Sequence, residues 1–108
     1  MTNTQNPPIE KKAGCIAFAT MILGDKWTPH ILSALYTRDL RFSELEDIVT
    51  GITPRTLSAK LELLTEHSIT NRQAYAEVPP RVVYSLTDQG KDLIPILRSM
   101  ADWGAKYS

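Results

Sequence analysis

The chain has little of what marks several large classes of protein. Its 108 residues include a single cysteine, so no intramolecular disulfide can form and a reducing compartment is expected. No apolar run approaches the roughly 20 residues of a membrane span. The first residues, MTNTQNPP, lack the basic and apolar regions of a signal peptide. We therefore expect a cytoplasmic protein without a membrane partner.

The chain also lacks net charge, because its twelve basic and twelve acidic residues cancel. An argument for a nucleic-acid partner must therefore depend on where the charges fall. The length suits one domain with one hydrophobic core. We expect a flexible polar tail over residues 1–8 and a single folded domain over residues 9–108.

Residue clusters for metal binding or catalysis are not apparent. His30, His67 and Cys15 are too few and too widely separated for a zinc signature, so both histidines are expected to be solvated or packed. The sequence shows no nucleophile–base pair, phosphate-binding loop or pair of acid–base carboxylates. We expect no enzymatic activity, no metal and no cofactor.

Helical patterns come first along the chain. An apolar run over residues 10–23 ends at Gly24, a residue typical of helix ends. Thr28-Pro29 predicts the capped start of a second helix that reaches about Tyr36, and residues 40–42 follow as an extended link.

Two further helices form a helix-turn-helix pattern. Ser43-x-x-Glu46 predicts a capping box at the start of the third helix, which Gly51 ends. Thr53-Pro54 then predicts the capped start of a fourth helix, which runs to about residue 67 after a tight turn. The residues expected to face inward from the third helix are Leu45, Ile48 and Val49.

The pattern changes after the fourth helix. Residues 71–76 and 81–86 alternate in polarity around Val78-Pro79-Pro80, which predicts two antiparallel strands joined by a loop. Thr87 then caps a long last helix, in which Pro95 should cause a kink. The expected fold is mainly α (α+β): a winged helix-turn-helix domain with a two-stranded wing and an additional dimerisation helix at each end.

The fourth helix has the pattern of a groove-binding helix. Leu61 and Leu64 lie within about 40° of Leu57 around the helix axis, which fixes the inward face. The opposite face carries short side chains and one arginine, and the major groove admits a helix whose leading side chains are not bulky. The alternative is an ordinary solvated face, and Glu62 on the same side would repel phosphate.

A cation at the wing tip and three around the second helix favour double-stranded DNA as the partner over the solvated face. Acidic residues are expected mostly elsewhere, at Glu44, Glu46, Asp47, Glu66, Asp88, Asp92 and Asp102. The candidate DNA contacts are Lys26, Arg38, Arg41, Thr53, Arg55, Thr56, Ser58, Ala59, Lys60 and Arg81.

Four stretches carry a family resemblance: LGDKWT (23–28), LRFSELEDIVTGITPRTLSAKLELL (40–64), YAEVPPRVVYSLTDQG (75–90) and DWG (102–104). With these motifs the chain resembles the HxlR-type winged helix-turn-helix transcriptional regulators of bacteria. The resemblance implies a homodimer, packed through its first and last helices, that binds a pseudo-palindromic operator. It also implies a recognition helix over residues 53–66 and a wing over about 76–82.

The apolar residues of the terminal helices point to more than one side, which favours a dimer over a well-wrapped monomer. The expected interface residues are Ile16, Phe18, Met21, Ile22, Ile94, Ile96, Leu97, Met100 and Trp103. Cys15 is a candidate redox sensor, since in some family members a nearby cysteine responds to oxidants or electrophiles. Lys11 and Lys12 share a helical face with it; an inert, half-buried cysteine is the alternative.

The leading interpretation is a dimeric, sequence-specific DNA-binding transcriptional regulator. A winged-helix module for protein–protein contact, without DNA binding, is the alternative. A pocket between the first and last helices would suit a small apolar effector. The sequence does not give the operator, the target genes, the sign of regulation or the effector.

Overall fold

The structure is a computed structural model that describes residues 13–108. The expected tail over residues 1–8, the start of the first helix, and Lys11 and Lys12 lie outside the described residues. The elements are α1 (Ala13–Leu23), α2 (Thr28–Thr37), β1 (Leu40–Arg41), α3 (Phe42–Ile48), α4 (Pro54–Glu66), β2 (Thr70–Tyr75), β3 (Arg81–Leu86), α5 (Asp88–Lys91) and α6 (Ile94–Tyr107).

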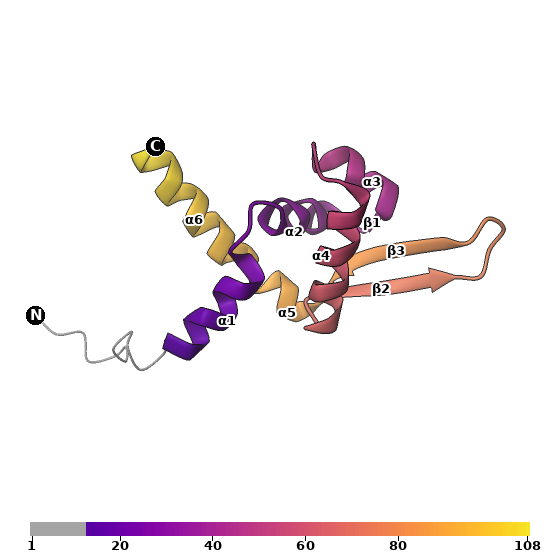
Figure 1. Ribbon diagram of the computed structural model, residues 1–108, viewed down its shortest axis with the longest axis horizontal. Coiled ribbons are helices and arrows are strands. Elements are labelled where there is room, and N and C mark those ends of the chain that lie inside the picture. The colour runs from indigo at the N-terminus through magenta and orange to yellow at the C-terminus, as the bar shows by residue number, and fades with distance from the viewer. Residues whose placement is uncertain (1–12) are drawn as a thin grey trace, which may run out of the picture.

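A small antiparallel sheet accompanies the helices, with strand order β1-β3-β2. The hairpin of β2 and β3 is the expected wing, and it projects away from the helices in Figure 1. Residues 40–41, expected as part of a link, instead form a third strand, because Leu40 pairs with Tyr84 and Arg41 with Val83 of β3. The winged helix-turn-helix fold is confirmed, with a sheet one strand larger than expected.

The hydrophobic core orients α4. Leu57, Leu61 and Leu64 are all buried, as the spacing predicts, and they belong to one cluster with Ile31 and Leu32 of α2. Burying a leucine contributes about 1.5–3 kcal/mol relative to leaving it exposed. This cluster therefore fixes which side of α4 faces solvent.

Two predictions about α3 are wrong in detail. Ile48 is 49% exposed because the helix ends there, whereas Leu45 and Val49 are buried as expected. The helix begins at Phe42, and its first turn is closed by the backbone N–H of Arg41, which donates to Glu44 at 2.8 Å. The capping box predicted from Ser43 to Glu46 therefore lies two residues earlier, from Arg41 to Glu44.

Two residues with positive φ flank α4. Gly51 has φ of 91° in the turn between α3 and α4, a conformation that a side chain would strain. Ser68 has φ of 61° just after α4. These turns set the direction in which the chain enters and leaves the helix.

The predicted long last helix is two helices. Thr87 does act as a cap, since its side chain accepts from the N–H of Gly90, but α5 ends at Lys91. Pro95 lies in the first turn of α6, where its missing N–H is tolerated, so it marks a helix start and no kink. Gly90 is buried against the Ile69 carbonyl, where there is no room for a Cβ atom.

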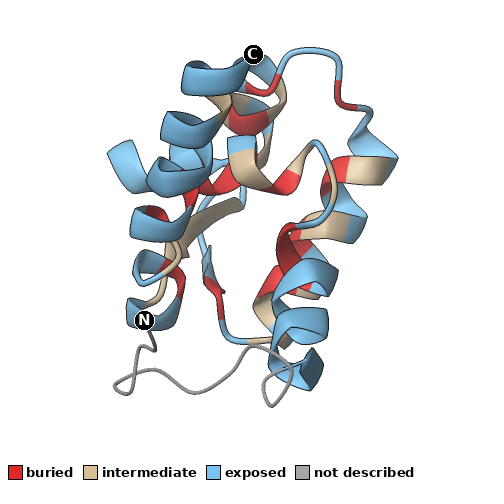
Figure 2. Ribbon diagram, turned by 90° about the vertical axis from the view of Figure 1, so that its left-hand side faces the viewer, coloured by how far each residue is buried: buried red, intermediate tan, exposed pale blue. Residues whose placement is uncertain are grey.

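The two terminal helices α1 and α6 extend from the side of the core opposite the wing (Figure 1). In Figure 2, which faces this side, exposed residues dominate the helices. Residues 13–21 of α1 are all exposed, and Ile22 and Leu23 alone among its residues are buried.

Asp25 connects the start of α2 to α4. Its carboxylate accepts from the backbone N–H groups of Trp27 and Thr28, both at 2.8 Å, and from the Thr28 hydroxyl at 2.7 Å. The Lys60 ammonium of α4 lies 3.4 Å away. The N-cap position of α2 is Trp27, so the cap predicted at Thr28 is wrong: Thr28 is the first residue of the helix and donates to Asp25.

Burial of the Asp25 carboxyl opposes its ionisation. The hydrogen bonds from Thr28 and Trp27, together with the Lys60 charge, outweigh burial and hold the pKa of Asp25 below its ordinary value. A carboxyl whose pKa is lower in the folded state stabilises that state above its unfolded pKa. This contribution disappears as pH falls through the folded pKa.

Asp25→Ala should lower the free energy of unfolding at pH 7 by about 1–2 kcal/mol, because it removes three hydrogen bonds at the start of α2 and an ion pair with Lys60. The difference from the wild type should shrink as pH falls below 4. Urea unfolding from pH 7 to pH 2.5 measures both effects. Asp47→Ala, at an exposed position on α3, is the control and should change stability by less than about 0.5 kcal/mol. A pH-independent difference would contradict this role for the carboxylate.

Candidate nucleic-acid interface

The exposed face of α4 carries short side chains in its N-terminal half. Arg55, Ser58 and Ala59 are exposed, on the side opposite the buried leucines. Serine and alanine leave room for a close approach, and the arginine can reach a base edge or a phosphate. No ion pair within residues 13–108 involves Arg55, so its charge is not neutralised inside the described chain.

Thr53 and Thr56 hold the first turn of α4. The Thr53 hydroxyl accepts from the N–H of Thr56 at 3.2 Å and donates to the Thr56 hydroxyl at 3.0 Å. The N-cap predicted at Thr53 is confirmed. Both hydroxyls thus serve the cap, which presents the helix N-terminus and its partial positive charge to solvent.

Lys60 faces away from the exposed side of α4. Its ammonium pairs with Asp25 at 3.4 Å, and its side chain is only 26% exposed. Of the residues expected on the DNA-facing side, it is the one turned toward the start of α2. Lys60 therefore links α4 to the start of α2.

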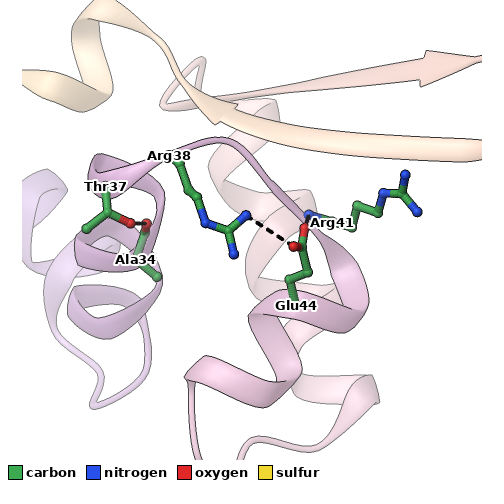
Figure 3. A network of polar contacts seen from close by, with 5 residues as sticks. All are labelled: Ala34, Thr37, Arg38, Arg41 and Glu44. Carbon is green, nitrogen blue, oxygen red and sulfur yellow. Dashed lines mark hydrogen bonds and ion pairs between the residues drawn. The ribbon is translucent and has the colours of Figure 1, made fainter.

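Arg38 and Arg41 lie on either side of Glu44 (Figure 3). The Arg38 guanidinium forms an ion pair with Glu44 at 3.1 Å, whereas the Arg41 side chain extends away from that carboxylate. The backbone N–H of Arg41 and the side chain of Arg38 hold the pKa of Glu44 below its ordinary value. Glu44 was expected away from the candidate cations, and that expectation is wrong, because this carboxylate neutralises one of them.

Lys26 lies near the turn that precedes α4. Its ammonium is 4.6 Å from the centre of the Trp27 ring. With His30 of α2, these two residues line a depression next to the end of α3. The remaining residues of this depression are Ile48, Val49 and Thr50.

A groove separates α4 from the wing. Arg72 of β2 lines this groove, a cation not among the predicted contacts because its place beside α4 depends on how the wing packs and not on a local pattern. Glu62 and Glu66 line the same groove, so Glu66 was also wrongly expected to lie elsewhere. The other lining residues are Ser58, Leu61, Thr65 and Tyr84.

Arg81 stands at the start of β3 and is held by the wing itself. Its guanidinium pairs with Glu77 at 2.8 Å and lies 4.3 Å from the centre of the Tyr75 ring. The only cation of the expected wing tip is thus paired with a carboxylate four residues earlier.

The expected dimer interface divides into two sets. Ile22, Ile94 and Leu97 are buried in the core of the chain itself, so their assignment to a second interface is corrected. Their side chains point from α1 and α6 toward α2 and the rest of the core. The other six residues are exposed: Ile16, Phe18, Met21, Ile96, Met100 and Trp103.

Cys15 is exposed on α1. His67 follows α4, and its ring makes an edge contact with Phe18 at 5.6 Å between centroids, so it is partly packed as expected. No group of metal-ligating side chains occurs among residues 13–108. No helix in that range is both long and apolar enough to cross a membrane.

Comparisons with known proteins agree with this geometry. Residues 22–108 match the family model described as HxlR-like helix-turn-helix. An uncharacterized HTH-type transcriptional regulator of Methanothermobacter thermautotrophicus is 44% identical over 85 residues, which are 79% of this chain. The match covers 65% of that relative, slightly under two thirds of its length.

A Bacillus subtilis protein, the uncharacterized HTH-type transcriptional regulator YdeP, is 39% identical over 95 residues, covering 87% of this chain and 74% of the relative. Among solved structures, the redox regulator HypR in its oxidized form superposes with a TM-score of 0.79 and 34% identity. That alignment covers 86% of this chain and 96% of HypR.

Proposed function

Because the chain belongs to the HxlR-like helix-turn-helix family, we propose that it is a sequence-specific DNA-binding regulator that acts as a homodimer. Its named relatives are transcriptional regulators, which confirms that the family is one of regulators and not of enzymes. The observation that carries the proposal is the division of α4 into a buried leucine face and an exposed face with Arg55, Ser58 and Ala59.

The N-terminal half of α4 enters the major groove in this proposal. Arg55 reaches a base edge or a phosphate, while Ser58 and Ala59 allow the helix to approach. Glu62 and Glu66 line the groove beside the later turns, where they disfavour deeper phosphate contact. Arg72 lines the same groove from β2 and is the cation there for a phosphate at the outer edge of the groove.

Arg41, Lys26 and Arg81 supply flanking contacts in this arrangement. The Arg41 side chain extends from the start of α3 and has no ion pair within residues 13–108. Arg38, Lys60 and Arg81 contribute less than an unpaired cation would, because each has a carboxylate partner within residues 13–108. A cation that must leave a carboxylate for a phosphate contributes less to DNA binding than a cation that has no partner in the free protein.

The homodimer forms through the exposed apolar residues of α1 and α6. Ile96, Met100 and Trp103 line one depression on α6, and Trp103 is 68% exposed. Exposed apolar area of this kind on the two terminal helices is typical of an interface. A two-fold dimer places two copies of α4 on successive turns of one DNA face, as a pseudo-palindromic operator requires.

The domain boundaries and the effector belong to the same proposal. Residues 9–108 act as one domain, and Cys15 on α1 is the residue through which an oxidant or electrophile would act. Its exposure supports access by such a reagent, and the similar protein HypR is a redox regulator. A winged-helix module for protein contact is the alternative function, and it predicts no binding to duplex DNA.

Arg55→Ala should weaken binding to the duplex upstream of the chain's own gene by about 1–3 kcal/mol, because it removes a base or phosphate contact. Gel shifts at rising ionic strength measure the loss and its salt dependence. Arg98→Ala is the matched control, since it removes the same charge from α6, where Arg98 lies beside Tyr36. Equal binding by both variants and the wild type would contradict the proposed role of α4.

Met100→Glu should convert the dimer to a monomer at micromolar concentration, because it places a charge within the apolar interface. Light scattering coupled to gel filtration gives the molar mass. Ile48→Glu is the control, since Ile48 on α3 is 49% exposed and Met100 is 50% exposed. A dimer in Met100→Glu, or a monomer in the wild type, would contradict an interface on α6.

A further inference from the structure

We infer that Glu77 is a regulatory carboxylate of the wing, which occupies Arg81 and must be exchanged for a phosphate when the wing meets DNA. This inference rests on the proposed DNA binding and assigns a role to Glu77, which lies in the loop between β2 and β3. Glu77 thereby sets how strongly the wing contributes to affinity and how steeply that contribution depends on salt.

Arg81 contacts both Glu77 and Tyr75. One terminal nitrogen lies 2.8 Å from a Glu77 carboxylate oxygen, and the guanidinium carbon lies 4.3 Å from the centre of the Tyr75 ring. Tyr75 is the cross-strand neighbour of Arg81 in the register of β2 and β3. The side chain is therefore folded against the base of the loop, held by an aromatic ring on one side and a carboxylate on the other.

The Arg81 side chain is partly buried. The side chain of Arg81 is 34% exposed although it stands on a projecting hairpin. Its Nε atom is buried and has no hydrogen-bond partner among the described residues. Arg81 can therefore meet a phosphate only through its two terminal nitrogens, one of which now pairs with Glu77.

The charges at the tip of the wing cancel. Between Thr70 and Leu86 the charged side chains are Arg72, Glu77 and Arg81. Arg72 lies in the groove beside α4, so the tip of the hairpin carries one cation and one carboxylate. A phosphate that approaches the tip meets a neutral pair, and the gain from the cation is offset by the loss of its pair with Glu77.

The size of the effect follows from the exposure of the pair. Glu77 is 48% exposed, and exposed ion pairs contribute up to about 1 kcal/mol, so releasing Arg81 should raise affinity about two- to five-fold. A cation that leaves a carboxylate for a phosphate releases fewer counterions overall than an unpaired cation does. The salt dependence should therefore steepen by about one unit when Glu77 loses its charge.

The experiment compares Glu77→Gln with the wild type in binding to the upstream duplex over a range of salt concentrations. The Gln variant keeps the size and a hydrogen-bond acceptor but removes the charge. Asp102→Asn, an exposed position on α6, is the control for total charge. We expect two- to five-fold tighter binding and a steeper salt slope for Glu77→Gln, and no change for Asp102→Asn.

A double-mutant cycle with Arg81→Ala separates partner exchange from simple repulsion. We expect the gain from Glu77→Gln to disappear in the Arg81→Ala background. A gain that persists there, or an equal gain in Asp102→Asn, would overturn the inference while leaving DNA binding intact. Failure of the wild type and all variants to bind the duplex would instead overturn the proposed function, and the inference with it.

Discussion

Burial of the leucine face of α4 is the constraint on which the rest of this structure depends. Leu57, Leu61 and Leu64 fix the rotation of the helix about its axis, and Gly51 with its positive φ fixes the direction from which the chain enters it. The exposed side that results carries the short side chains of Ser58 and Ala59 in the N-terminal half of α4 and the acidic side chains of Glu62 and Glu66 further along. The proposed mode of DNA binding follows from that orientation and needs no excess of positive charge.

The ion pairs show which cations of this electrically neutral chain remain available for DNA. Lys60 is paired with Asp25, Arg38 with Glu44 and Arg81 with Glu77, so three candidate contacts already have partners inside the chain. Arg41, Arg55 and Arg72 have no ion pair within residues 13–108. Affinity for a polyanion is then set by a few unpaired cations and by the ease with which the others exchange partners.

The sequence predicted α4 and the wing well because their signals are local, whereas the break between α5 and α6 was missed. The spacing of the leucines gave the inward face of α4, and alternation with prolines gave the wing. Contacts between distant residues were missed: the pairing of Leu40 with Tyr84, the link from Asp25 to Lys60, and the place of Arg72 beside α4. The burial of Ile22, Ile94 and Leu97 was misassigned because apolar residues in a sequence do not show which partner covers them.

Amide chemical shifts of the whole chain, measured by NMR during titration with its upstream duplex, test the central claim most directly. The account predicts that the largest shifts occur in residues 53–60, with further shifts in the wing over residues 70–86. The outer face of α6 should change little, because it lies in the proposed dimer interface. Shifts confined to α1 and α6, with residues 53–60 unaffected, would contradict the account.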